Sequence, residues 1–183
     1  MKLRKQHVSY IARKITNDLI TAPYIEVRKE KASIAAECEK ILIEDIEKEI
    51  KLDEHVGLIL EDREDDINFY NADYRQLFWM TKKRLANEFD VILNFEDRFS
   101  NIAHQIIDVL YEEDFIHFTV NDNQVKMLIQ GAIDTFIKGY DEADSAAYEK
   151  IKNYKRKLIP GTEDYDLVFK RLYEEELGKR GLI

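Results

Sequence analysis

The feature that most constrains the fold of this chain is its similarity to itself at a constant offset of 91 residues. Six residues of one stretch recur at that offset without a gap: Ser9, Ile11, Ala12, Ile15, Leu19 and Ile25 match Ser100, Ile102, Ala103, Ile106, Leu110 and Ile116. Self-similarity at a fixed offset indicates one structural unit used twice. We therefore expect two tandem helical repeats, residues 1–92 and 93–183, either separate or packed as one compact domain. The alternative is two unrelated helical halves with coincident spacing.

Long helices are expected because the sequence offers few places to turn. It has six glycines and two prolines, and its 45% hydrophobic and 36% charged residues are typical of a soluble, helix-rich protein. Apolar residues at helical spacing predict helices over 8–20 and 125–158, and a counterpart of the second over 33–66. In that counterpart Asp45 and Glu49 occupy positions that are apolar in the second half, so we expect a change of register or a bend there.

Short β-rich pieces follow the helices. Those at 24–27, 91–93, 115–118 and 182–183 each begin five residues after an apolar or small helical residue. Each unit then reads as helix, short strand, long helix, helix and short strand, a mainly α fold with a few short β strands. Winged-helix domains enter their hairpin in a similar way, although any helix that stops against a short strand gives this spacing. Trp79, the only tryptophan, is expected to lie partly in the core.

Charge and cysteine usage indicate where such a chain works. The formal net charge of -9 argues against broad, nonspecific binding of nucleic acid, which needs a basic surface. The single cysteine, Cys38, excludes an intramolecular disulfide, fits a reducing compartment, and has the apolar neighbours of a buried, inert thiol. The charged first residues do not resemble a signal peptide, and no apolar run reaches the about 18 residues that cross a bilayer. We expect a cytoplasmic protein without membrane contact.

The most specific candidate sites are two segments of opposite charge at equivalent places in the two units. The acidic segment contributes four candidate docking residues: Glu61, Asp62, Asp65 and Asp66. The equivalent basic segment contributes four candidate residues that bind a partner or an anion: Lys152, Lys155, Arg156 and Lys157. Opposite charges at equivalent places favour docking between units or protomers. The basic corner, with its neighbouring tyrosines, is also suited to phosphates and bases, and the plainer alternative is two solvated helix ends.

Signatures of catalysis are missing from the sequence. It has no glycine-rich phosphate loop, no nucleophile elbow, no Cys-x-x-Cys pair and no His-x-x-x-His pair. The abundant carboxylates lack the Glu-x-x-His pattern of bundle metal sites. We therefore expect no metal, cofactor or small-molecule substrate. A carboxylate-based enzyme is the third hypothesis, after an interaction protein and a nucleic-acid-binding factor.

Several strings spread over the whole chain resemble a known bacterial family. They are MKLRKQHVSYIARKI, ADYRQLFWMTKKRLA, EDRFSNIAH and YEKIKNYKRKLIPGTEDYDLVFKRLYEEELGKRG. The family they resemble is domain of unknown function five hundred and seven. The resemblance implies a bacterial, cytoplasmic protein and brings no activity, cofactor or catalytic residue. Our expectation is a noncatalytic interaction or scaffold protein that binds another protein or a second copy of itself; the alternative is an RNA- or DNA-binding accessory factor.

Overall fold

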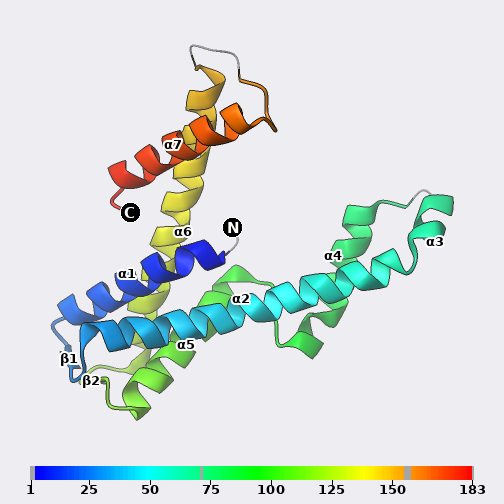
Figure 1. The fold of residues 1–183 in the computed structure, drawn as a ribbon. Helices are drawn as coiled ribbons and strands as arrows, with labels where there is room; N and C mark the ends of the chain where they lie inside the picture. Colours follow the sequence, from blue (N-terminus) through cyan, green and yellow to red (C-terminus); the bar gives the residue numbers. More distant parts are fainter. Residues whose placement is uncertain (1–2, 71, 155–157, 183) are drawn as a thin grey trace.

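The fold is mainly helical with two short antiparallel strands, as the sequence predicts (Figure 1). This computed structural model describes residues 3–70, 72–154 and 158–182, apart from the side chains of residues 66 and 68. Its elements are, in order, η1 (Lys5–His7), α1 (Val8–Thr21), β1 (Ile25–Val27), α2 (Lys31–Glu61), α3 (Glu64–Phe69), α4 (Tyr74–Leu85), η2 (Ala86–Phe89), α5 (Phe95–Glu112), β2 (Ile116–Phe118), α6 (Asp122–Lys152) and α7 (Glu163–Lys179).

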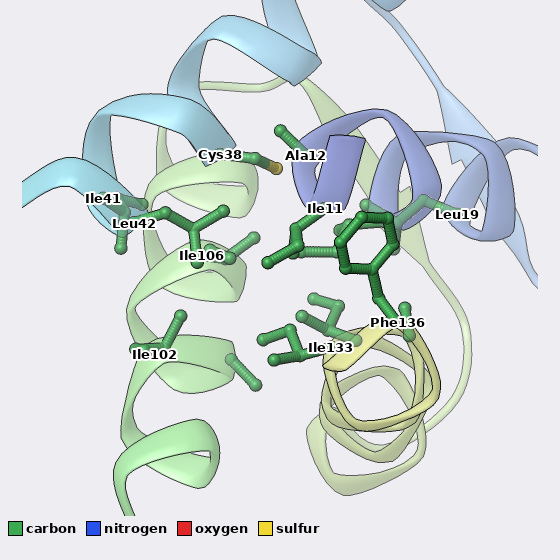
Figure 2. Close-up of a cluster of buried hydrophobic side chains, with 14 of the residues drawn as sticks. Ile11, Ala12, Leu19, Cys38, Ile41, Leu42, Ile102, Ile106, Ile133 and Phe136 are labelled. Atoms are coloured by element: carbon green, nitrogen blue, oxygen red, sulfur yellow. The ribbon is translucent and has the colours of Figure 1, made fainter. Parts of the chain in front are cut away.

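Four helices enclose the central core. Helix α1 packs against α2 and α6, and α5 packs against the same two helices. Figure 2 shows Ile11 and Leu19 of α1, Leu42 of α2, Ile106 of α5 and Ile133 of α6 in one cluster, and all five are fully buried. Burial of one such side chain stabilises the fold by about 1.5–3 kcal/mol. Because the apolar faces of both halves meet here, neither half has a core of its own in this region.

The two strands join the halves directly. β1 and β2 pair antiparallel, with Ile25 opposite Phe118, Glu26 opposite His117 and Val27 opposite Ile116. A two-stranded ribbon of this length is not stable alone. Burial of Ile25 and Ile116 in the central core therefore holds it in place.

The strands predicted at 91–93 and 182–183 are wrong for the described residues, since neither Val91 nor Leu182 belongs to a strand; Ile183 lies outside the description. The five-residue spacing has another cause. The N–H of Val91 donates to the carbonyl of Ala86 at 2.9 Å, and the N–H of Leu182 donates to that of Leu177 at 3.0 Å. The preceding residues, Asp90 and Gly181, have φ of 53° and 64°. This geometry is the left-handed cap that commonly ends a helix, so the spacing reports how the helices stop.

Two arms extend from the central core, because α2 and α6 continue well beyond it (Figure 1). On the first arm, α3 and α4 lie along the end of α2, and Leu52, Val56 and Leu85 form a small separate core. On the second arm, α7 lies along the end of α6, with Ala147, Ile151 and Leu172 between them. The molecule therefore exposes two elongated tips, each supported by only two main helices.

Candidate interaction surface

A cluster of buried charges holds the first arm to the central core. We call Asp45, Glu49, Lys82 and Arg98 the ionic cluster. Lys82 Nζ lies 2.7 Å from Glu49 Oε1, and Arg98 Nη1 lies 2.7 Å from Glu49 Oε2. Arg98 Nη2 lies 2.6 Å from Asp45 Oδ2, and Lys82 Nζ lies 2.6 Å from Asp53 Oδ1. Burial alone would raise the pKa of Glu49, but the hydrogen bonds from Lys82 and Arg98 outweigh it and lower the pKa to about 2.

The ionic cluster explains why carboxylates occupy apolar positions of α2. Of the two expectations, a change of register or a bend, the change of register is wrong, since α2 is one unbroken helix from Lys31 to Glu61 whose buried positions match those of α6 at an offset of 91. Glu49 remains on the inner face and is buried, because Lys82 of α4 and Arg98 of α5 neutralise it. The cluster thus fixes α4 and α5 against α2. The sequence signal was the pair of misplaced carboxylates, but it did not reveal which cations would meet them.

The second arm meets the core through rings instead of charges. We call His7, Phe136, Tyr140 and Tyr173 the aromatic cluster. The ring of His7 lies 4.0 Å from that of Tyr140, which lies 4.6 Å from Phe136 and 6.0 Å from Tyr173, centroid to centroid. Burial and the nearby positive charge of Arg4 lower the pKa of His7 to about 4, so this imidazole is neutral at pH 7. Burial also raises the pKa of Tyr140 to about 12.

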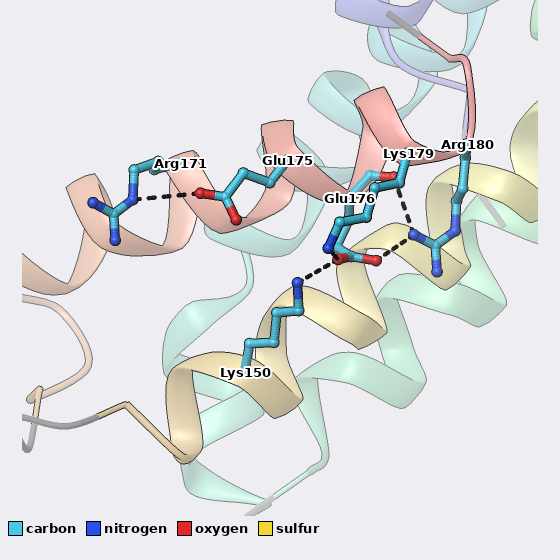
Figure 3. A network of polar contacts seen from close by, with 6 residues as sticks. All are labelled: Lys150, Arg171, Glu175, Glu176, Lys179 and Arg180. Atoms are coloured by element: carbon cyan, nitrogen blue, oxygen red, sulfur yellow. Dashed lines mark hydrogen bonds and ion pairs between the residues drawn. The ribbon is translucent and has the colours of Figure 1, made fainter.

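Helix α7 is further tied to α6 by a network of ion pairs around the buried Glu176 (Figure 3). Its carboxylate is paired with Lys150 from α6 and with Lys179 and Arg180 from the end of α7. Their hydrogen bonds hold the pKa of Glu176 well below its usual range. Lys150, Lys179 and Arg180 are therefore paired within the arm.

The predicted acidic residues lie at the tip of the first arm. Glu61 is the last residue of α2, Asp62 caps that helix, and Asp65 lies in α3; all three are exposed. Asp66 also belongs to α3, but its side chain lies outside the description. The acidic segment is thus a solvent-facing corner where α2 turns into α3.

The predicted basic residues belong to the tip of the other arm. Lys152 ends α6, is exposed, pairs with Glu149 at 3.0 Å, and lies with its Nζ 4.6 Å from the centre of the Tyr148 ring. Lys155, Arg156 and Lys157 lie outside the described residues. Since Lys152 and the acidic segment are at the ends of different arms (Figure 1), one chain does not bring them together.

A groove on the first arm is a feature that sequence reasoning missed. Its volume is about 450 Å³, and it runs between the end of α2, α3 and α4. Its walls include Ile59 and Leu60 from α2, and Leu77 and Met80 from α4. A concave, mainly apolar surface of this size is typical of a binding site. The two cationic side chains that line the groove are Arg63 and Arg84, and both are exposed.

Exposed apolar side chains surround the groove. Met80 is 60% exposed and Tyr70 is 75% exposed, and both line it; Phe69, beside Tyr70, is 81% exposed. Trp79 is 55% exposed, so the expectation that it lies in the core is wrong. Helix α4 is only partly covered by α2, which leaves Trp79 and Met80 facing solvent. The sequence signal that could have revealed this surface was the row of large apolar residues beside the cations of one short helix.

Other kinds of site do not emerge from the described residues. Within 3–70, 72–154 and 158–182, no group of three or more His, Cys, Asp or Glu side chains is placed to hold a metal ion. None of the helices in this part of the chain combines the length and apolarity needed to span a bilayer.

These features define a class: a mainly helical protein with two arms, one of which carries an apolar groove. The chain belongs to the family "Protein of unknown function (DUF507)", whose model matches residues 1–182. This match confirms the resemblance seen in the sequence. A comparison with curated proteins finds no match.

Proposed function

We propose that this protein is a noncatalytic interaction or scaffold protein whose binding surface is the tip of the first arm. The observation that carries the proposal is the groove between α2, α3 and α4, together with the exposed Tyr70 and Met80 that line it. Monomeric proteins rarely gather large apolar side chains on one exposed surface unless a partner covers them. Tyr, Trp and Met are also enriched at protein interfaces. The groove thus fits a protein partner.

The test is capture of partners from cells that naturally contain this protein. The baits are the full chain, a Tyr70→Ser/Met80→Ser variant and a Met127→Ser control, with bound protein and bound nucleic acid measured separately. Met127 is a matched control because it is another exposed helical methionine, 64% exposed, on α6. We expect partner proteins to bind the full chain and the control and to be lost from the double variant. Equal recovery by all three baits would overturn the proposal.

A second candidate function is binding of RNA or DNA by the basic corner of the second arm. The observation that favours it is the exposed Lys152 above the ring of the exposed Tyr148, since a cation beside a ring suits phosphate and base together. In the same experiment, a Lys152→Glu bait should then lose nucleic acid. That loss, with protein recovery unchanged, would favour this function over the first.

We also propose that the two halves are tandem repeats of one unit, at the offset of 91 residues seen in the sequence. Support comes from the element bounds, since α2 covers 31–61 and α6 covers 122–152. The strands cover 25–27 and 116–118, and Glu26 lies opposite His117, its own counterpart. Pairing of counterparts at the centre of an antiparallel ribbon is what a two-fold relation between the halves requires.

The two arm junctions support the same proposal. At an offset of 91, Asp45 corresponds to Phe136, Glu49 to Tyr140, Lys82 to Tyr173 and Arg98 to His7. The ionic cluster and the aromatic cluster therefore occupy corresponding positions and perform the same packing task with different chemistry.

As for its setting, we propose that the protein works in the reducing cytoplasm of a bacterium. The use of a single cysteine fits a compartment in which proteins do not rely on disulfides. That cysteine, Cys38, is fully buried beside Ala12 (Figure 2). Burial raises the pKa of its thiol to about 12, which makes it unreactive as a disulfide partner.

A further inference from the structure

The charges around the groove differ from one side to the other. Helix α4 carries the exposed cations Arg75, Lys83 and Arg84, and its sequence, YRQLFWMTKKRL, contains no acidic residue. At the end of the groove, where α2 turns into α3, the exposed carboxylates Glu61 and Asp65 accompany the cation Arg63, so this corner has mixed charge. In a chain with a net charge of -9, the α4 side is therefore a local basic surface beside an apolar floor.

These cations are available to a partner. Arg84 lines the groove and, among the described residues, its guanidinium makes no ion pair and no hydrogen bond. Lys83 does not line the groove but is the exposed residue next to Arg84, and its ammonium also makes no ion pair or hydrogen bond among the described residues. Lys82, by contrast, turns inward to the ionic cluster and is consumed there. Lys83 and Arg84 are thus exposed on α4, while Lys82 alone of these three neighbours attaches α4 to the ionic cluster. Lys83 and Arg84 can therefore pair with carboxylates of a partner.

The shape of the groove indicates a helix. Its apolar wall on α4 consists of Leu77, Met80 and Thr81, followed by Arg84, a helical spacing along one face. The opposite wall on α2, Ile59 and Leu60, belongs to a second helix. A third helix can pack between two such helices by placing apolar residues three and four positions apart into the groove.

We propose that the groove binds an amphipathic helix of a partner protein, with acidic residues along the edge that faces α4. This inference rests on the proposed function and adds the chemistry of the partner. Met80 and Leu77 receive its apolar face, and Lys83 and Arg84 pair with its carboxylates. Charge complementarity of this kind selects partners and orients them on the surface.

The test uses two fluorescent helical peptides and the full chain. Both peptides carry the same stripe of leucines; one has glutamates along an edge of the stripe and the other has lysines there. Fluorescence anisotropy should show that the glutamate peptide binds about tenfold more tightly, since several exposed charge pairs change sign together. A Lys83→Glu/Arg84→Glu variant should reverse the preference. Met80→Ser should weaken both peptides, and Lys170→Glu, an exposed change on α7, should leave both unaffected.

Each other outcome is decisive. Equal binding of both peptides, absence of binding, or a preference that survives Lys83→Glu/Arg84→Glu would overturn the proposed partner chemistry. If partner capture from cells still depends on Tyr70 and Met80, the proposed function would stand without it. Light scattering tests the remaining alternative, a second copy of the chain in the groove. A concentration-dependent dimer that Met80→Ser abolishes would show this and overturn the inference.

Discussion

Glu49 is the residue on which the attachment of the first arm depends. Its carboxylate receives Lys82 from α4 and Arg98 from α5, and all three side chains are buried. We predict that Glu49→Gln lowers the free energy of unfolding by about 2–3 kcal/mol, because Lys82 and Arg98 lose the buried carboxylate that they share and keep only Asp53 and Asp45. Urea denaturation would measure the change. Glu47→Gln, which removes a solvent-exposed partner of Lys5, should leave the free energy of unfolding nearly unchanged; a similar effect of both variants would contradict the prediction.

His7 makes the second junction sensitive to acid. The folded pKa of His7 is about 4, below its ordinary value of 6.5. A depressed pKa means that stability is fully present above about pH 6.5 and is lost as the pH falls toward 4, because the buried imidazole must take up a proton. We predict that His7→Phe reduces the loss of unfolding free energy between pH 7 and pH 4 by about 3 kcal/mol.

Thermal denaturation at several pH values would measure it, with His104→Gln as the control. His104 is exposed, so its replacement should leave the pH dependence unchanged. If His7→Phe has the same pH dependence as the unmodified chain, protonation of His7 does not weaken the fold.

At the scale of single residues, the sequence indicated only part of the two arm junctions. Asp45 and Glu49 on an apolar stripe indicated something unusual at the right place. Their partners Lys82 and Arg98 come from later segments of the chain. Both are buried, and no local sequence pattern predicts the burial of such a cation. Likewise, nothing local distinguishes His7 from an exposed histidine, because its environment is made by α6 and α7.

Among the helices and strands, the ends of helices are where the backbone conformation most clearly restricts which residue can be present. Gly181 follows α7 with a φ of 64°, a conformation that strains other residues, whereas Gly178 lies within α7 and has ordinary helical geometry. A Cβ at either position would meet no atom within 4 Å, so backbone conformation alone decides the result. We predict that Gly181→Ala destabilises the protein by about 1 kcal/mol and that Gly178→Ala stabilises it by about 0.5 kcal/mol.

Urea denaturation of the two variants side by side would test this prediction, because the chemical change is the same. Opposite signs are the expected result. Two changes of the same sign would mean that the left-handed cap is not what sets the end of α7.

The elements themselves were largely predictable, and their ends were not. The apolar spacing correctly placed α1, α2 and α6, because each has one face in the central core. The pieces at 91–93 and 182–183 were mistaken for strands because β-rich composition is shared by strands and by the apolar residues that follow a helix cap. Within the described part of the chain, β1 and β2 are the strands that pair.

For the whole molecule, the proposed repeat can be tested at the two junctions. A fourfold variant, Asp45→Phe/Glu49→Tyr/Lys82→Tyr/Arg98→His, would give the first junction the side chains of the aromatic cluster. Well-packed apolar groups often replace a buried ionic network without loss. We predict that this variant folds and is destabilised by less than Glu49→Gln alone. Urea denaturation and circular dichroism would measure it; a fourfold variant that is less stable than Glu49→Gln would contradict the correspondence.

The placement of the arms and the groove could not be read from the chain in advance. The repeated spacing indicated that the halves are alike, but not that α1 would pack against α6 as well as α2. The groove exists because α4 covers only one side of α2 and leaves Leu77 and Met80 at its edge. Contacts of this kind depend on segments far apart in the sequence, and periodicity carries no information about them.

The continuity of α2 has a mechanical consequence. Its 31 residues span about 45 Å as one rod from the ribbon at β1 to the groove at the tip. The central core holds the first half of this rod, up to Ile46, so the last 15 residues form a lever arm of about 23 Å, and a tilt of about 5° at the core would carry the tip by about 2 Å. A partner that binds in the groove therefore exerts its force at a distance from the central core, and a small rotation of α2 at the core accompanies a larger displacement of the tip.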